Sequence, residues 1–125
     1  MPMDIRREGQ QQLELTLRDT LHYAELREAQ RVATKLIAEA GKVAILVVLD
    51  GFEGWERGGE WGDVSFLVEH DSNIEKLAIV GEERWRDEVL VFTAAGLRRS
   101  PVRYFTDLAS ARAWLIDAAA SSLSA

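Results

Sequence analysis

A run of seven consecutive apolar residues at 43–49, rich in β-branched side chains, constrains the fold more than any other feature of the chain. Such a run is typical of a strand buried on both faces, the position of a central strand in a parallel or mixed sheet. The sequence then becomes polar and glycine-rich over residues 50–63. Because ligands of open α/β sheets bind beyond the carboxyl ends of such strands, this segment is the expected place for a site.

The other apolar residues predict strands and helices in alternation around this central strand. Leucines alternate with polar residues at 13–17, as in an outer strand, which could run antiparallel at an edge. Further strands are expected at residues 74–80 and 102–105, and helices at residues 23–40, 60–70, 82–95 and 107–118. Gly41 is expected to end the first helix, and Thr106 or Asp107 to cap the last. The order predicts an α/β fold: a mixed, largely parallel sheet of four to five strands flanked by helices.

Length and composition narrow the class of protein. The 125 residues fit one domain at 10–120, with an N-terminal extension at 1–9 and a C-terminal tail at 121–125. The net charge of -6 disfavours binding to nucleic acid or to an anionic membrane surface. The chain has no cysteine, which excludes disulfides and thiolate chemistry. Without a signal peptide or an apolar run of about 20 residues, the expected location is the bacterial cytoplasm.

If the strands are parallel, the segments at 50–63, 81–85 and 106–107 converge at one edge of the sheet. An apolar pocket there would suit a small hydrophobic or acyl ligand, and the candidate ligand-binding residues are Asp50, Phe52, Trp55, Trp61 and Trp85. The alternative is that the aromatic rings only close the end of the sheet. For Asp50 the alternative is a hydrogen-bonded turn residue. We expect no catalytic residue and no cofactor, because the chain contains no nucleophile motif or phosphate-binding motif.

Acidic residues cluster after the central strand, where they offer oxygen ligands for Mg²⁺ or Ca²⁺. They are Asp50, Glu53, Glu56, Glu60 and Asp63. Their spacing matches no metal-binding loop, so an acidic solvated segment is the expected interpretation. A metal-assisted hydrolase that uses three of these carboxylates, Asp50, Glu53 and Asp63, stays open as an alternative. The two histidines, His22 and His70, are expected at the surface or as caps.

Three passages together resemble the SpoIIAA-like family, which shares the STAS-type fold of anti-sigma-factor antagonists and is related in outline to CRAL-TRIO lipid-binding modules. The passages are residues 50–55 (DGFEGW), residues 74–85 (IEKLAIVGEERW), and residues 102–105 (VRYF) followed by residues 113–115 (AWL). Their order and spacing extend over residues 11–116. The resemblance implies a mixed sheet flanked by helices. Anti-sigma-factor antagonists carry a phosphorylatable serine after the central strand, where this chain has residues 50–53 (DGFE), without a hydroxyl.

These observations support three hypotheses of different classes. The first is a non-enzymatic module that binds a partner protein through the convergent edge and its neighbouring helices. The second is a carrier of a small apolar ligand or lipid, and the third is the metal-assisted hydrolase. A homodimer is also plausible, because exposed apolar area on a helix or an outer strand commonly creates a two-fold interface.

Overall fold

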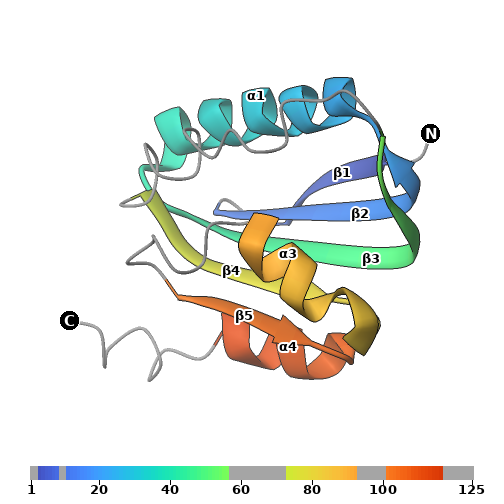
Figure 1. Cartoon of the computed structure of the whole chain (residues 1–125). Helices are drawn as coiled ribbons and strands as arrows, with labels where there is room; N and C mark the ends of the chain where they lie inside the picture. The colour runs from blue at the N-terminus through green and yellow to red at the C-terminus, as the bar shows by residue number, and fades with distance from the viewer. Residues whose placement is uncertain (1–2, 9–10, 57–72, 93–100, 117–125) are drawn as a thin grey trace.

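A computed structural model describes residues 3–8, 11–56, 73–92 and 101–116 of the chain (Figure 1). These residues form five strands, three α-helices and one short 3-10 helix. In chain order they are β1 (Met3–Glu8), β2 (Gln12–Leu21), α1 (Tyr23–Ala40), β3 (Val43–Trp55), β4 (Ile74–Val80), the 3-10 helix η2 (Glu83–Trp85), α3 (Arg86–Phe92), β5 (Val102–Phe105) and α4 (Leu108–Leu115). The helix expected at residues 60–70 lies outside the described residues.

The strands form one sheet in the order β1-β2-β3-β4-β5. Strand β1 is antiparallel to β2, and the remaining neighbours are parallel. This mixed, largely parallel sheet confirms the predicted fold class. The prediction that residues 13–17 form an outer strand is wrong, because β1 pairs along β2 on its outer side. In β1 the apolar Ile5 has only charged neighbours, Asp4, Arg6 and Arg7. This segment therefore lacks the alternation of apolar and polar residues from which a strand is predicted.

The helices are divided unequally between the two faces of the sheet (Figure 1). Helices α1 and α3 cover one face, where Leu36 and Val89 pack with Ile45 and Ile79 of the sheet. Helix α4 covers the opposite face, where Ala111 packs with Leu46, Ala78, Val80 and Phe105. Right-handed crossovers between successive parallel strands that advance in one direction place their helices on the same face. Helix α4 follows β5, the last of the described strands, and does not connect two of them, so it is free to pack on the opposite face.

Both ends of α1 and the beginning of α4 match the predictions, whereas α4 ends at Leu115, earlier than the predicted residue 118. Helix α1 begins at Tyr23 and is followed by Gly41, whose φ of 86° favours glycine and whose amide donates to the Ile37 carbonyl. At α4, the carboxylate of Asp107 accepts hydrogen bonds from both the amide and the hydroxyl of Ser110. Asp107, and not Thr106, is therefore the cap of this helix.

Strand β3 is longer than the sequence predicted. The polar segment expected to begin at residue 50 starts as strand, because β3 continues to Trp55 beside β2. Gly51 and Gly54 have φ angles of 68° and 116°, which non-glycine residues rarely adopt. The register between the strands shifts in the same region, so that Phe52 lies opposite Asp19. These bulges let the strand continue through a sequence whose apolar alternation has ended.

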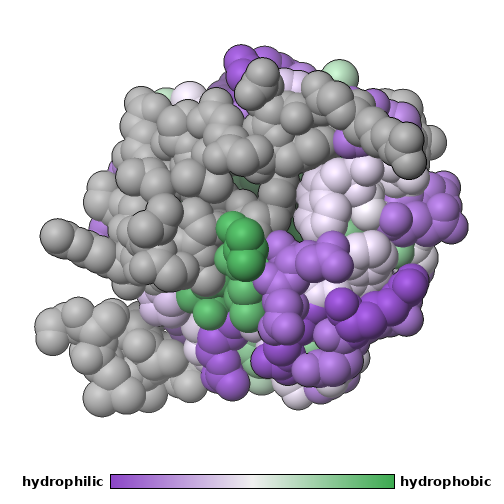
Figure 2. Space-filling view, in the orientation of Figure 1, coloured by the Kyte–Doolittle hydropathy of each residue, from purple (hydrophilic) through white to green (hydrophobic). Residues whose placement is uncertain are grey.

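The surface over α3 carries a hydrophobic patch beside hydrophilic surface (Figure 2). On this helix the side chain of Val91 is 78% exposed, whereas Val89 is buried in the core. In the described part of the chain, no helix combines the length and the apolar character needed to cross a membrane.

Candidate functional site

The carboxyl ends of the parallel strands lie side by side at one edge of the sheet. We call this edge the rim and define it as residues 21–22, 52–56, 81–85 and 106–107. Backbone hydrogen bonds join its parts: the Glu56 amide donates to the Leu21 carbonyl, and the Gly81 amide donates to the carbonyl of Phe105, the residue just before 106–107. Within the described residues, the predicted convergence of chain segments at this edge is therefore present.

Three aromatic side chains from two parts of the chain meet at the rim. The ring centroid of Phe52 lies 5.2 Å from that of Trp55 and 5.0 Å from that of Trp85. The two indole rings are 6.0 Å apart. All three pairs are edge-to-face, which is a favourable arrangement for aromatic rings. We call these residues the aromatic trio, and each of its rings packs on the other two.

The trio is set into the α1 side of the sheet. Phe52 is buried with Leu17, Leu21 and Ala29, whereas the two tryptophans are only partly buried. At Gly54 a Cβ atom would lie 3.6 Å from the Trp85 ring, an ordinary contact distance, so glycine is favoured there by its φ of 116° and not by lack of space. The indole Nε1 of Trp85 is buried and has no hydrogen-bond acceptor among the described residues. A buried polar group of this kind is uncommon.

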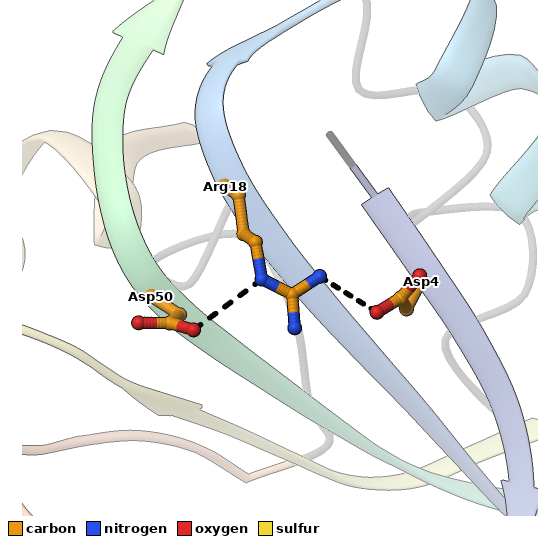
Figure 3. A network of polar contacts seen from close by, with 3 residues as sticks. All are labelled: Asp4, Arg18 and Asp50. Atoms are coloured by element: carbon orange, nitrogen blue, oxygen red, sulfur yellow. Dashed lines mark hydrogen bonds and ion pairs between the residues drawn. The ribbon is translucent and has the colours of Figure 1, made fainter. Parts of the chain in front are cut away.

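Asp50 belongs to a polar network with Arg18 and Asp4 (Figure 3). The Arg18 side chain extends between strands, with Nη1 donating to Asp4 Oδ2 at 2.6 Å and Nε to Asp50 Oδ2 at 3.4 Å. Arg18 alternates with the buried Leu17, so this network lies on the sheet face away from α1. The hydrogen bond from Arg18 lowers the pKa of Asp4. The bulge at Gly51 explains the separation, because it turns Phe52 to the α1 side while Asp50 stays on the other.

The remaining candidate ligand-binding residue, Trp61, lies outside the described residues. The same holds for Glu60 and Asp63 of the acidic cluster and for His70. Within residues 3–8, 11–56, 73–92 and 101–116, no three histidine, aspartate or glutamate side chains are grouped so that they could hold a metal ion. Glu53 is exposed on β3.

A histidine and two glutamates stand beside the trio, where α1 begins. His22 Nδ1 lies 2.9 Å from Glu56 Oε2, and Glu56 Oε1 accepts a 2.6 Å hydrogen bond from the Tyr23 amide. Glu25 Oε1 accepts from the His22 amide at 3.0 Å. The hydrogen bond to Glu56 raises the pKa of His22, and the same contact lowers the pKa of Glu56. A carboxylate from the end of β3 thus supports the positive end of the α1 dipole.

The sequence interpretation missed this pairing, although it expected His22 to act as a surface or cap residue. Both partners directly follow parallel strands, β2 and β3, that are neighbours in the sheet. A topology that placed those two strand ends together would have identified the pair. Topology was the missing information, because the residues are 34 positions apart in the chain.

A close contact at the end of β4 fixes the η2 side of the rim. The Tyr104 hydroxyl donates a 2.6 Å hydrogen bond to the Glu82 carbonyl. Burial, and then the negative charge of Glu83, raise the pKa of this hydroxyl. Gly81 lies between these groups: a Cβ atom there would be 2.6 Å from Tyr104 Oη and 2.7 Å from Leu49 Cδ1. Glycine is therefore required at this turn for steric reasons, and the sequence suggested only that it ends the strand.

Comparison with known proteins agrees with this architecture. The family model described as SpoIIAA-like matches residues 12–116. The fold is similar to that of an uncharacterized protein of the DUF3478 family, with a SpoIIAA-like fold, from Shewanella loihica PV-4. The two structures superpose with a TM-score of 0.68 at 16% sequence identity, covering 90% of this chain and 91% of the other. Among curated proteins, no sequence matches this chain significantly.

Proposed function

Because this chain belongs to the SpoIIAA-like family, we propose that it is a non-enzymatic module of the cytoplasm that binds a partner protein through the rim and α3. The single observation that carries the proposal is the exposed Val91 side chain on α3, the helix that directly follows Trp85 of the aromatic trio. Figure 2 shows hydrophobic surface over α3, and exposed apolar surface is a feature of protein-binding sites.

The charge around Val91 indicates the chemistry of the partner. Residues 82–91 contain four carboxylates and two guanidinium groups: Glu82, Glu83, Asp87 and Glu88, with Arg84 and Arg86. The net charge of the whole chain, -6, has the same sign. A partner surface with basic residues around an apolar contact would complement this part of the molecule and would associate faster at low salt.

The aromatic trio supports a binding surface of defined shape. Its rings pack on one another at 5.0 to 6.0 Å, so η2 and the end of β3 are joined at one position. A surface that is already ordered loses less conformational freedom when a partner binds. On this proposal the trio positions the rim, while α3 supplies the exposed contact.

The segment at residues 50–53 bears on regulation. In anti-sigma-factor antagonists the corresponding place holds the phosphorylatable serine, whereas residues 50–53 (DGFE) occupy it here without a hydroxyl. Asp50 of this segment forms an ion pair with Arg18. The proposed module therefore binds its partner without a phosphorylation switch at this place. Its binding is governed by concentration and by ionic strength instead.

Two matched variants test the proposal. Val91→Glu changes the exposed apolar side chain on α3, and Ile116→Glu makes the same change at a residue after α4, where the exposed fraction is 79%. The immobilised proteins are incubated with extract of the source cells, and bound proteins are quantified by mass spectrometry. We expect a specific partner to be lost with Val91→Glu and retained with Ile116→Glu, and direct binding of that purified partner to weaken with added salt. Equal retention by both variants, or no specific partner, would contradict the proposal.

A small apolar ligand at the rim is the second candidate function. The buried indole Nε1 of Trp85, which has no acceptor among the described residues, favours it, because a ligand carbonyl or carboxylate could accept that hydrogen bond. Native mass spectrometry of the purified protein tests this candidate. A reproducible adduct that Trp85→Phe removes would support it, whereas a bare protein mass together with unchanged tryptophan fluorescence on adding fatty acids would reject it.

A further inference from the structure

Strand β1 ends the sheet on one side and carries charged residues of both signs. Within the described residues, its inner edge pairs with β2 and no strand pairs with its outer edge. Asp4, Arg6 and Arg7 are exposed, whereas Ile5 is partly buried and packs against the core on the α1 side. An edge strand of this kind presents backbone donors and acceptors that a further strand can use.

The sequence of β1 is self-complementary in one antiparallel register. When two copies pair about a two-fold axis perpendicular to the sheet, opposite residues point to the same face. If the axis passes through Ile5, then Ile5 faces its counterpart, and each Asp4 faces the Arg6 of the other copy. An axis at Asp4 would oppose two carboxylates, and an axis at Arg6 would oppose two guanidinium groups, which is unfavourable in both cases. Electrostatics therefore select the register centred on Ile5.

The surroundings of β1 are compatible with this register. Asp4 accepts from Arg18 through Oδ2, and a carboxylate has two oxygens, so a second guanidinium can be accommodated. Ile5 contributes to the apolar layer beneath α1, and two facing Ile5 side chains would continue this layer from one copy to the next. The acidic residues of α3 follow β4, which is three strands away from β1 in the sheet. They therefore do not repel a second copy that approaches β1.

We propose that this protein forms a two-fold homodimer by antiparallel pairing of β1 with β1 of a second copy, centred on Ile5, so that the two sheets become continuous. The interface is independent of the proposed partner surface on α3. A single strand pair buries less area than most permanent dimers, so the dimer is a reversible, concentration-dependent one.

Charge variants test the register. Arg6→Glu places two carboxylates opposite each other at both ends of the interface, and Asp4→Lys does the same with two cations. Sedimentation equilibrium should show that either change raises the dimer dissociation constant at least about tenfold. A one-to-one mixture should recover dimer, because the mixed pair again joins opposite charges twice. A monomer at every concentration of the unaltered protein, or a mixture no more dimeric than its components, would overturn the proposal.

Cysteine cross-linking provides a second test that does not depend on charge. The chain has no cysteine, so Ile5→Cys introduces one thiol per copy, directly opposite its counterpart. Opposite Cβ atoms in such a pair are about 4.5–5.5 Å apart, close to the reach of a disulfide. In the control Arg7→Cys the two thiols are offset by four residues, about 14 Å along the strands. Oxidation should cross-link Ile5→Cys and leave Arg7→Cys monomeric on a non-reducing gel; equal cross-linking of both would overturn the register.

Discussion

Arg112 Nη2 lies 3.0 Å from Glu14 Oε1 and 3.2 Å from Glu14 Oε2, although the two residues are 98 positions apart. Arg112 is on α4 and Glu14 on β2, so this ion pair joins the last described helix to the second strand. The Glu14 side chain is only 7% exposed, whereas that of Arg112 is 43% exposed. A nearly buried carboxylate is thus paired with a partly exposed guanidinium.

We expect Arg112→Ala to destabilise the protein by about 1–3 kcal/mol, because it leaves the buried Glu14 carboxylate without its partner. Arg7→Ala is a matched control: Arg7 is 44% exposed, but its partner Glu39 is 47% exposed. Exposed ion pairs contribute about 0–1 kcal/mol, so the control should have a smaller effect. Urea unfolding followed by circular dichroism measures both. Equal effects would mean that the burial of Glu14 has no energetic consequence.

Phe52 is central to the aromatic trio and is buried against Leu17, Leu21 and Ala29. We expect Phe52→Ala to lower the free energy of unfolding by about 3–5 kcal/mol, since it removes a buried ring that contacts both tryptophans. Phe52→Leu retains most of the apolar volume and should be milder. Chemical denaturation followed by tryptophan fluorescence gives both values. An effect of Phe52→Ala no larger than that of Phe52→Leu would show that the trio is not a packed unit.

Gly81→Ala should be destabilising by about 1–3 kcal/mol, because the added methyl group would lie 2.6 Å from Tyr104 Oη and 2.7 Å from Leu49 Cδ1. Removing the hydroxyl with Tyr104→Phe relieves one of the two contacts. The double variant should therefore be more stable than the sum of the single effects predicts. Thermal unfolding of the unaltered protein, the two single variants and the double variant measures these effects. Strict additivity would show that the backbone moves away from Tyr104.

The pair of His22 and Glu56 should make stability depend on pH. Folding raises the pKa of His22 above its ordinary value of 6.5, so its contribution is complete below pH 6.5 and is lost as pH rises through the folded pKa. The pKa of Glu56 is lowered from 4.5, so its contribution is present above pH 4.5 and is lost as pH falls through the lowered value. The pair therefore stabilises most between pH 4.5 and 6.5.

Nuclear magnetic resonance titration of the imidazole protons measures the pKa of His22 directly, with His22→Gln used to assign the signal. Glu56→Gln should return the pKa towards 6.5, because the amide carries no charge and is a weaker hydrogen-bond acceptor. Glu53→Gln serves as the control, since Glu53 is an exposed carboxylate on the same strand. A titration of His22 that Glu56→Gln leaves unchanged would exclude the ion pair in solution.

The sequence predicted the sheet class, the central strand and α1 because each depends on a long or regular apolar pattern. It did not predict β1, in which one isoleucine stands among charged residues. The sequence also predicted that a loop begins at residue 50, whereas β3 continues to Trp55 in the structure. In both places pairing with β2 determines the strand, and such pairing is a tertiary effect that local pattern does not contain.

The candidate site was predicted in part for a related reason. Alternation along a strand assigns residues to faces, and one bulge reverses the assignment. Asp50 and Phe52 should share a face in a regular strand, yet Gly51 separates them: Asp50 pairs with Arg18, and Phe52 joins the trio. The meeting of Trp55 with Trp85 was inferred from strand topology, and their ring centroids are 6.0 Å apart. To predict the pair of His22 and Glu56, one must know that β2 and β3 are neighbours in the sheet. The spacing of the two residues in the sequence does not show this.

The order of strands in space follows their order in the chain, and this has a consequence for how the protein is made. As synthesis proceeds from the N-terminus, each new parallel strand can add to an edge that already exists, without rearranging earlier pairs. The face later covered by α4 receives its helix last. Until α4 emerges from the ribosome, Leu46, Ala78 and Phe105 stay open to solvent, so the nascent chain exposes an apolar surface that can aggregate.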